Sequence, residues 1–103
     1  MHYRIEFIPE AAQDYKNLDG SVKKLVDKKI NELEKNPFIG ELLGNKNDID
    51  LSGFYKIYVK NKIYRIVYRL LPLDKIEIVE IWGIGKRDKL EIYKTIGKRL
   101  RDK

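Results

Sequence analysis

The chain has 103 residues, of which 43% are hydrophobic and 37% charged, and its formal net charge is +6. A chain of this length can bury one modest core, so we expect a single domain spanning residues 1–103. Without cysteine and with one histidine, disulfides, thiolate chemistry and a histidine-clustered metal site are excluded. No apolar run approaches the roughly 20 residues of a membrane span, and no signal-peptide pattern opens the chain, so we expect a soluble, cytoplasmic protein.

The first third of the chain predicts a strand followed by two helices. Residues 3–8 alternate between apolar and polar side chains, which indicates a strand. Pro9 suits the first turn of a helix that we expect over residues 10–18. Ser21 is the candidate N-cap of a second helix, which Pro37 ends. Two helices joined by so short a turn should form a hairpin packed on a sheet.

The rest of the chain predicts a loop, three strands and a final helix. Residues 38–53 are rich in Gly, Asn and Asp and predict a loop, held down by Leu42, Leu43, Ile49 and Leu51. Strands follow over residues 54–59, 63–71 and 75–84, separated by short turns. The third of these is apolar on both faces, which suits a central strand. The apolar stripe of residues 89–101 predicts a helix.

The element order β-α-α-β-β-β-α indicates the α+β class. We expect a mainly antiparallel four-stranded sheet with the helices packed on one face, and a second strand that runs against the first. Strand alternation then places four side chains together on the other face, the candidate binding surface: Lys56, Tyr58, Arg65 and Arg69.

Positive charge is concentrated in two segments. Residues 55–69 contain five basic and no acidic side chains, and residues 86–103 contain eight basic and three acidic ones. Aromatic side chains are interspersed in both. If the fold brings the segments together, they form a surface suited to phosphate groups.

The sequence resembles the RelE/ParE toxin superfamily over nearly its whole length. The block Tyr64-Arg65-Ile66-Val67-Tyr68 is common to the superfamily, and the block from Gly85-Lys86-Arg87 to Tyr93 resembles the RelE branch. The resemblance implies a toxin of a type II toxin–antitoxin system: a ribosome-dependent endoribonuclease that cuts mRNA in the ribosomal A site. It also implies three partners, namely a cognate antitoxin, the ribosome and mRNA, with neither metal nor cofactor. ParE-type members share the fold and instead poison DNA gyrase.

The resemblance also implies the site residues. It matches Lys56, Arg65, Arg87 and Tyr93 to the catalytic residues of RelE-type toxins. Such toxins often carry a second lysine two residues after the first, and this chain has Tyr58 there, which leaves the general base open between lysine and tyrosine. We expect the RNA-binding residues to be Tyr58, Lys60, Arg69, Lys86 and Lys89.

The chemistry of RNA cleavage agrees with this set. Attack by the 2′-hydroxyl needs a proton acceptor, and stabilisation of the extra negative charge on the phosphate, which arginine supplies. Lysine or tyrosine can accept the proton if surrounding positive charge lowers the pKa. Alternative functions are a gyrase inhibitor without catalysis, and a degenerate family member that only binds its antitoxin. Purely structural roles also remain open, such as a cross-strand pair between Arg65 and Glu77 or a core position for the Tyr93 ring.

Overall fold

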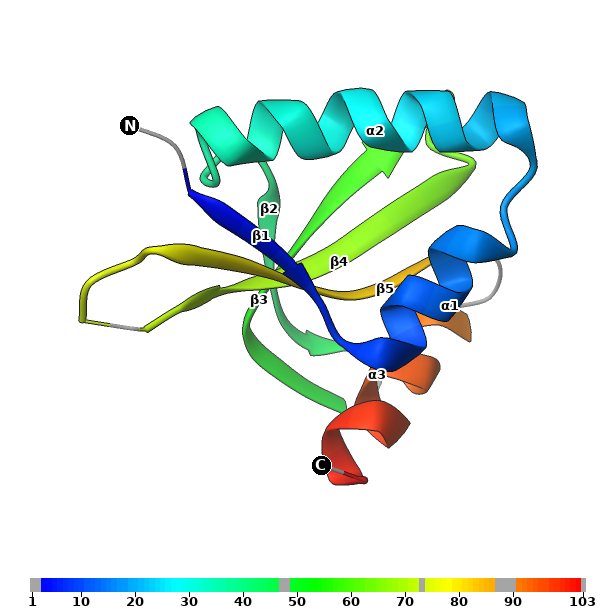
Figure 1. The fold of residues 1–103 in the computed structure, drawn as a ribbon. Coiled ribbons are helices and arrows are strands. Elements are labelled where there is room, and N and C mark those ends of the chain that lie inside the picture. The colour runs from blue at the N-terminus through cyan, green and yellow to red at the C-terminus, as the bar shows by residue number, and fades with distance from the viewer. Residues whose placement is uncertain (1–2, 47–48, 73, 87–90, 103) are drawn as a thin grey trace.

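The fold combines three helices with a five-stranded sheet, as the computed structural model shows for residues 3–46, 49–72, 74–86 and 91–102 (Figure 1). In chain order the elements are β1 (Arg4–Phe7), α1 (Pro9–Lys16), α2 (Gly20–Lys35), β2 (Glu41–Lys46), β3 (Ile49–Val59), β4 (Tyr64–Leu71), β5 (Ile78–Lys86) and α3 (Glu91–Arg101). The expected α+β class is confirmed. Among these described residues, no helix is long and apolar enough to cross a membrane.

The sheet is mixed, with strand order β1-β5-β4-β3-β2. β1 pairs with β5 in parallel, and the other three pairings are antiparallel. The expectation of a mainly antiparallel sheet is therefore confirmed, but it has five strands rather than four. The second expected strand, here β3, runs in the same direction as β1 and not against it, because β2 makes the return run first and β3 then reverses direction.

The loop expected over residues 38–53 is wrong, because this region contains the edge strand β2 and the first half of β3. The pairing register shifts between Leu42 and Gly44, and Gly44 has a φ of 94°, a left-handed conformation that suits glycine. Leu42 is 65% exposed while the adjacent Leu43 is 9% exposed. The two leucines therefore face opposite sides of the sheet, and the bulge interrupts the period by which a strand is recognised.

Asp19 caps the longest described helix, α2. Its carboxylate accepts a hydrogen bond from the backbone N–H of Val22 at 3.0 Å, and Ser21 Oγ donates to the same carboxylate at 2.7 Å. The prediction of Ser21 as the N-cap is therefore wrong by two positions. The helix ends at Lys35, as expected from Pro37. Its buried face carries Val22, Val26 and Leu33.

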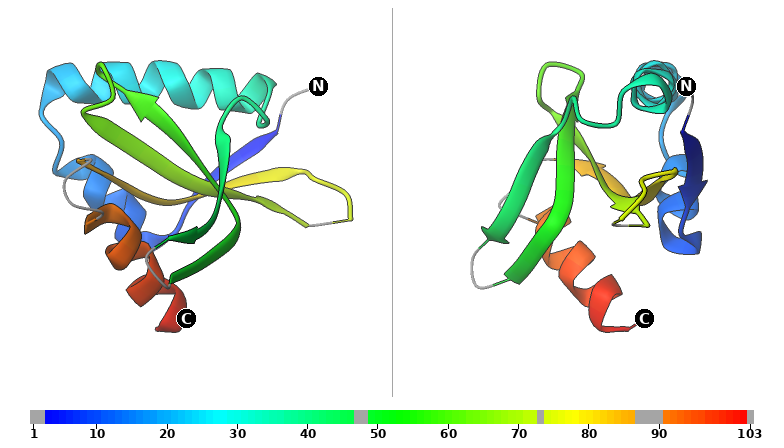
Figure 2. Two further views of the ribbon diagram at one scale, coloured as in Figure 1. Left: turned by 180° about the vertical axis from the view of Figure 1, so that it is seen from behind. Right: turned by 90° about the vertical axis from the view of Figure 1, so that its left-hand side faces the viewer.

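The helices cover both faces of the sheet, so the prediction that they share one face is wrong (Figure 2). On the face of α2, the Tyr68 hydroxyl donates to the Pro37 carbonyl at 2.9 Å. On the other face, α3 lies against Gly83 of β5. A Cβ at Gly83 would stand 2.5 Å from Ile96 Cδ1 of α3. Because Gly83 has no side chain, α3 can pack directly against β5 at this position.

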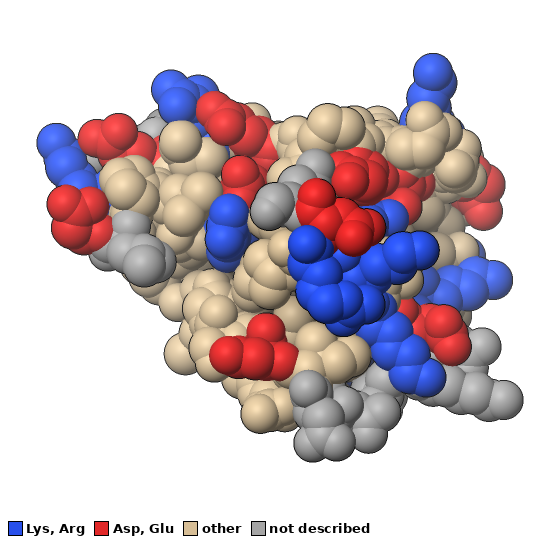
Figure 3. All heavy atoms as spheres, turned by 90° about the horizontal axis from the view of Figure 1, so that it is seen from below, with Lys and Arg blue, Asp and Glu red and all other residues tan. Residues whose placement is uncertain are grey.

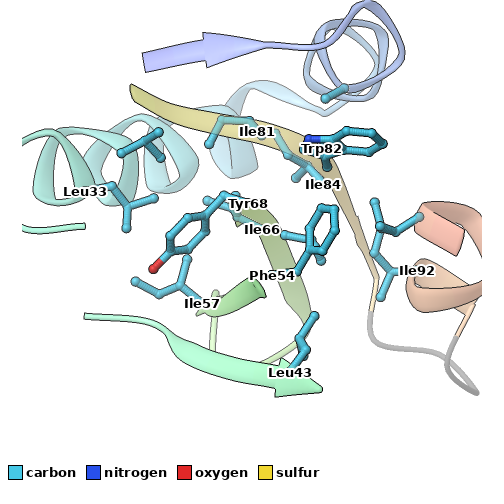
Figure 4. Close-up of a cluster of buried hydrophobic side chains, with 14 of the residues drawn as sticks. Leu33, Leu43, Phe54, Ile57, Ile66, Tyr68, Ile81, Trp82, Ile84 and Ile92 are labelled. Atoms are coloured by element: carbon cyan, nitrogen blue, oxygen red, sulfur yellow. The ribbon is translucent and has the colours of Figure 1, made fainter. Parts of the chain in front are cut away.

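The core extends through the sheet from α2 to α3 (Figure 4). Leu33 points into it from α2, and Ile92 points into it from α3. On the α3 face, the rings of Phe54 and Trp82 meet edge to face, with centroids 5.3 Å apart. Beyond the end of β1, the Asp14 carboxylate of α1 accepts a hydrogen bond from the backbone N–H of Ile84 at 3.1 Å, which satisfies the exposed edge of β5.

Candidate active site

Four of the predicted site residues lie on one face of the sheet, as strand alternation predicted. Tyr58 of β3 is paired with Arg65 of β4, and Lys56 with Val67, in unbroken register. Phe54 is likewise paired with Arg69, so Lys56, Tyr58, Arg65 and Arg69 all point to the face that α3 covers in part. The face is therefore not an open platform, because α3 closes one side of it.

Arg65 is held between two tyrosine rings. Its guanidinium carbon lies 5.0 Å from the ring centroid of Tyr58 and 5.0 Å from that of Tyr93 in α3. Its NH1 donates to the Tyr93 hydroxyl, and its NH2 lies 3.5 Å from the Tyr58 hydroxyl. The Tyr93 hydroxyl thus reaches the predicted site, although its ring is buried in the core at 1% exposure.

Arg65 is also buried, with only 4% of its surface exposed. Among the described residues, no carboxylate forms an ion pair with it, and its Nε has no hydrogen-bond partner. The structural alternative of a pair with Glu77 is wrong, since Glu77 contacts Lys75 and the cross-strand neighbour of Arg65 on β5 is Gly85. A buried cation without an acidic partner is costly, and an incoming anion would offset that cost.

Tyr58 is the centre of this group of charges. Lys56 Nζ donates a hydrogen bond of 2.9 Å to its hydroxyl. Lys62, in the turn after β3, lies 5.5 Å from its ring centroid. The hydrogen bond from Lys56 lowers the pKa of the Tyr58 hydroxyl, and the positive charges of Arg65 and Lys56 lower it further, against desolvation and the Glu41 carboxylate.

Glu41 of β2 brings a negative charge to this cluster. Its Oε2 lies 3.9 Å from Lys56 Nζ, and its side chain is 69% exposed while that of Lys56 is 12% exposed. Sequence analysis missed both Glu41, which fell in the expected loop, and Lys62, which was only part of a basic segment. The cross-strand pairing of Glu41 with Lys56 is a long-range contact that no local pattern signals.

A cavity of about 300 Å³ adjoins this cluster. It is lined by Lys56, Tyr58 and Ile57 of β3, by Lys29 and Glu32 of α2, and by the segment of Ile39, Gly40 and Glu41. Lys56 and Tyr58 therefore line this cavity, whereas the buried Arg65 and Tyr93 do not.

Arg69 belongs to a separate, neutralised cluster. Its Nε donates to Glu80 Oε1 at 2.7 Å, and its guanidinium carbon lies 4.8 Å from the Trp82 ring centroid. Trp82 Nε1 donates to the same Glu80 oxygen at 2.6 Å. These contacts give Arg69 a structural role near the end of β4, away from Tyr58.

The remaining predicted RNA-binding residues are less constrained. Lys60, in the turn after β3, and Lys86, at the end of β5, are exposed. Arg87 and Lys89 lie outside the described residues. On the side where α3 lies, Lys and Arg side chains gather in one dense group (Figure 3), and the last turn of α3 carries three basic residues: Lys98, Arg99 and Arg101. Within the described ranges, no three His, Cys, Asp or Glu side chains are arranged to hold a metal ion.

Comparison with known proteins gives this arrangement a family. A model of the ParE toxin of type II toxin–antitoxin systems, parDE, matches residues 5–91. The mRNA interferase toxin RelE of Escherichia coli strain K12 is 28% identical over 102 residues, which cover 97% of this chain and 99% of that protein.

Solved structures agree. A mutant E. coli RelE toxin in the free state superimposes with a TM-score of 0.75 at 27% identity, covering 97% of this chain and 99% of that one. The same mutant toxin in complex with an antitoxin RelBc peptide gives a TM-score of 0.68 at 27% identity, covering 91% and 93%. The chain therefore belongs to the ParE toxin family of type II toxin–antitoxin systems, within the RelE/ParE superfamily and with the fold of RelE.

Proposed function

We propose that this toxin is a ribosome-dependent endoribonuclease that cuts translated mRNA in the A site. The 2′-hydroxyl of the RNA attacks the adjacent phosphorus, and the 5′-oxygen leaves. Support comes from relatives named mRNA interferases and, within this chain, from the cluster around Tyr58. The activity would place the protein in the cytoplasm.

The observation that carries the proposal is the buried charge of Arg65, which contacts the rings of Tyr58 and Tyr93 and has no carboxylate partner among the described residues. Three cations within 5.5 Å of one phenol ring make a strongly positive, partly desolvated site. Such a site favours the phosphorane-like transition state, whose extra negative charge it offsets without reorganisation. Arg65 contributes this field and holds both tyrosine hydroxyls in place.

The other roles are supported by position for Lys56, Tyr93, Lys60 and Lys86, and by the family resemblance for Arg87 and Lys89. Lys56, at the cavity wall, contributes charge next to the phosphate. Tyr93 helps to orient the substrate through its contact with Arg65. Arg87 binds the scissile phosphate directly. The exposed Lys60 and Lys86, together with Lys89, bind the flanking RNA backbone. No metal is needed for these steps, and the ribosome supplies the alignment of the RNA, a contribution that can be large.

The partner that silences the toxin is a cognate antitoxin. A RelE structure holds an antitoxin RelBc peptide, and the basic segments of this chain suit an extended, acidic segment that orders on binding.

Primer extension on a translated mRNA tests the proposal. We expect codon-phased cuts with the protein and none without it, and none when the same mRNA is not translated. The family model that matches is that of ParE, which supports gyrase inhibition as the second candidate. Cleaved DNA with intact mRNA in expressing cells would favour that function and reject the endonuclease.

A further inference from the structure

The contacts of the Tyr58 hydroxyl are not those expected of a tyrosine that only packs in the core or only stacks on a base. Its hydroxyl accepts a hydrogen bond from Lys56 Nζ at 2.9 Å and lies 3.5 Å from Arg65 NH2. Both neighbours are cationic donors with no acceptor capacity. Within the described part of the chain, the hydroxyl oxygen therefore receives positive partners from two adjacent strands.

We propose that Tyr58 is the general base that takes the proton from the attacking 2′-hydroxyl. This inference rests on the proposed function and assigns the step that the residue pattern left open between lysine and tyrosine.

The contacts of the ring argue against the competing role, in which Tyr58 stacks on a base. Lys56 Nζ lies 4.9 Å from the ring centroid, Arg65 5.0 Å and Lys62 5.5 Å. A base stacked on this ring would have to displace these cations. Tyr58 itself lines the cavity beside Lys56.

Lys56 is the weaker candidate for the base. It donates its N–H to Tyr58 and faces Glu41 at 3.9 Å, both of which suit the ammonium form, and an ammonium has no lone pair. The phenolate, by contrast, is stabilised by every cation in the cluster.

The charged groups around Tyr58 favour its ionisation. The hydrogen bond from Lys56 and the charge of Arg65 lower the pKa of the phenol, and Glu41 opposes them. Lys62 adds positive charge over the Tyr58 ring, and the Tyr93 hydroxyl accepts a hydrogen bond from Arg65. Across the cavity, α2 presents Lys29 and Glu32, which are of opposite charge. The balance is positive, in the direction that a base needs near neutral pH.

The step balances as follows. The Tyr58 phenolate takes the 2′-hydroxyl proton, the bond from O2′ to phosphorus forms, and the bond from phosphorus to O5′ breaks. The leaving O5′ takes a proton from water, and the products are a 2′,3′-cyclic phosphate and a 5′-hydroxyl. The phenol returns its proton to solvent.

Single-turnover cleavage on ribosomes programmed with a defined mRNA tests the assignment, using Tyr58→Phe across a pH series. The wild-type rate should rise with pH until the phenol is ionised. Tyr58→Phe should lose on the order of 10²–10⁴-fold in rate, and it should lose that rising limb while still binding the ribosome. Tyr55→Phe is the matched control: it deletes a hydroxyl from the same strand, on the ring that stacks on Tyr68, and should keep both rate and limb.

A second measurement needs no ribosome. In the isolated protein with Cζ-labelled tyrosine, the Tyr58 signal, identified by its absence in Tyr58→Phe, should titrate below the ordinary tyrosine pKa of 10.0. Lys56→Met should shift it upward.

The outcomes separate the two claims. If the wild-type protein cuts mRNA and Tyr58→Phe keeps its rate and pH profile, the base assignment is overturned and the proposed function stands. A Tyr58 signal that titrates at or above the ordinary tyrosine pKa would also overturn it. If the wild-type protein does not cut translated mRNA, the proposed function and this inference fall together.

Discussion

Asp14 of α1 and Arg99 of α3, far apart in sequence, are joined by two hydrogen bonds. Arg99 NH1 donates to Asp14 Oδ2 at 2.7 Å, and NH2 donates to Oδ1 at 3.0 Å. NH1 also donates to the Trp82 carbonyl at 2.8 Å. Both side chains are largely buried, at 22% and 15% exposure. The pair thus fastens the terminal helix, which carries Tyr93, to the first helix and to β5.

Breaking that pair should loosen the site. Asp14→Ala leaves a largely buried arginine without its carboxylate and the Ile84 N–H without its acceptor, so we expect a loss of about 2–4 kcal/mol in unfolding free energy. Denaturant unfolding measures it. Glu6→Ala, which removes the exposed partner of Arg4, is the control and should cost under about 0.5 kcal/mol. Equal losses in the two variants would show that the Asp14–Arg99 pair has no special weight.

The close packing of α3 on Gly83 of β5 gives a second prediction. Gly83→Ala places a Cβ 2.5 Å from Ile96 Cδ1 and 3.0 Å from Arg99 NH1, so α3 must shift, and we expect a loss of about 1–3 kcal/mol. Gly20→Ala has nothing within 4 Å of its Cβ and lies in the first turn of α2. It should be neutral or stabilising by up to about 1 kcal/mol. Thermal unfolding of both variants measures these changes in stability. A Gly83→Ala protein as stable as the wild type would contradict the close packing of α3 on β5.

Tyr68 should make the unfolding free energy depend on pH in the alkaline range. Burial raises its pKa from 10.0 to about 12. Because the folded pKa lies above the unfolded one, this contribution is fully present below pH 10 and is lost as pH rises toward 12. A difference of about two between the folded and unfolded pKa corresponds to at most about 3 kcal/mol of unfolding free energy. Comparing the unfolding free energy of wild-type protein and Tyr68→Phe between these pH values isolates the effect, and parallel curves would refute it.

Arg87→Ala should abolish growth arrest and mRNA cutting while the fold stays intact. The reason is the loss of a phosphate contact worth about 3–4 kcal/mol in the transition state, comparable to one oxyanion-hole donor. Plating efficiency and primer extension in expressing cells measure it. Arg4→Ala removes an exposed arginine far from Tyr58 and should remain toxic. A soluble, fully toxic Arg87→Ala protein would contradict the role of Arg87.

Association with the antitoxin should depend on salt. Five basic and no acidic side chains over residues 55–69 steer an acidic segment toward the toxin. We expect the association rate to fall steeply as ionic strength rises, while dissociation changes little. Stopped-flow binding measures both rates. An association rate indifferent to salt would mean that the antitoxin does not bind through this basic surface.

Strand alternation alone predicted the shared face of Lys56, Tyr58 and Arg65, because a two-residue period is a local property that the register of β3 and β4 preserves. The antiparallel order of β3, β4 and β5 followed from their short turns. The location of Arg65 beneath two rings did not follow, because burial depends on where α3 packs.

Other features lay beyond local patterns. The amphipathic stripe of α3 shows which of its sides is buried, but not which face of the sheet receives it. β2 was missed because a bulge and Gly44 break its period. The parallel partner of β1 was missed because that pairing joins strands separated by most of the chain.

That parallel pairing orders events during synthesis. β5 lies between β1 and β4, so β1 has no neighbouring strand in the sheet until residues 78–86 have emerged from the exit tunnel. Closing a contact of such long sequence separation carries a large loop entropy, which delays it further. The contacts of Arg65 are completed later still, when Tyr93 of α3 packs against it. A nascent chain therefore holds Arg65 without its contact to Tyr93 until the segment that contains Tyr93 has emerged from the ribosome.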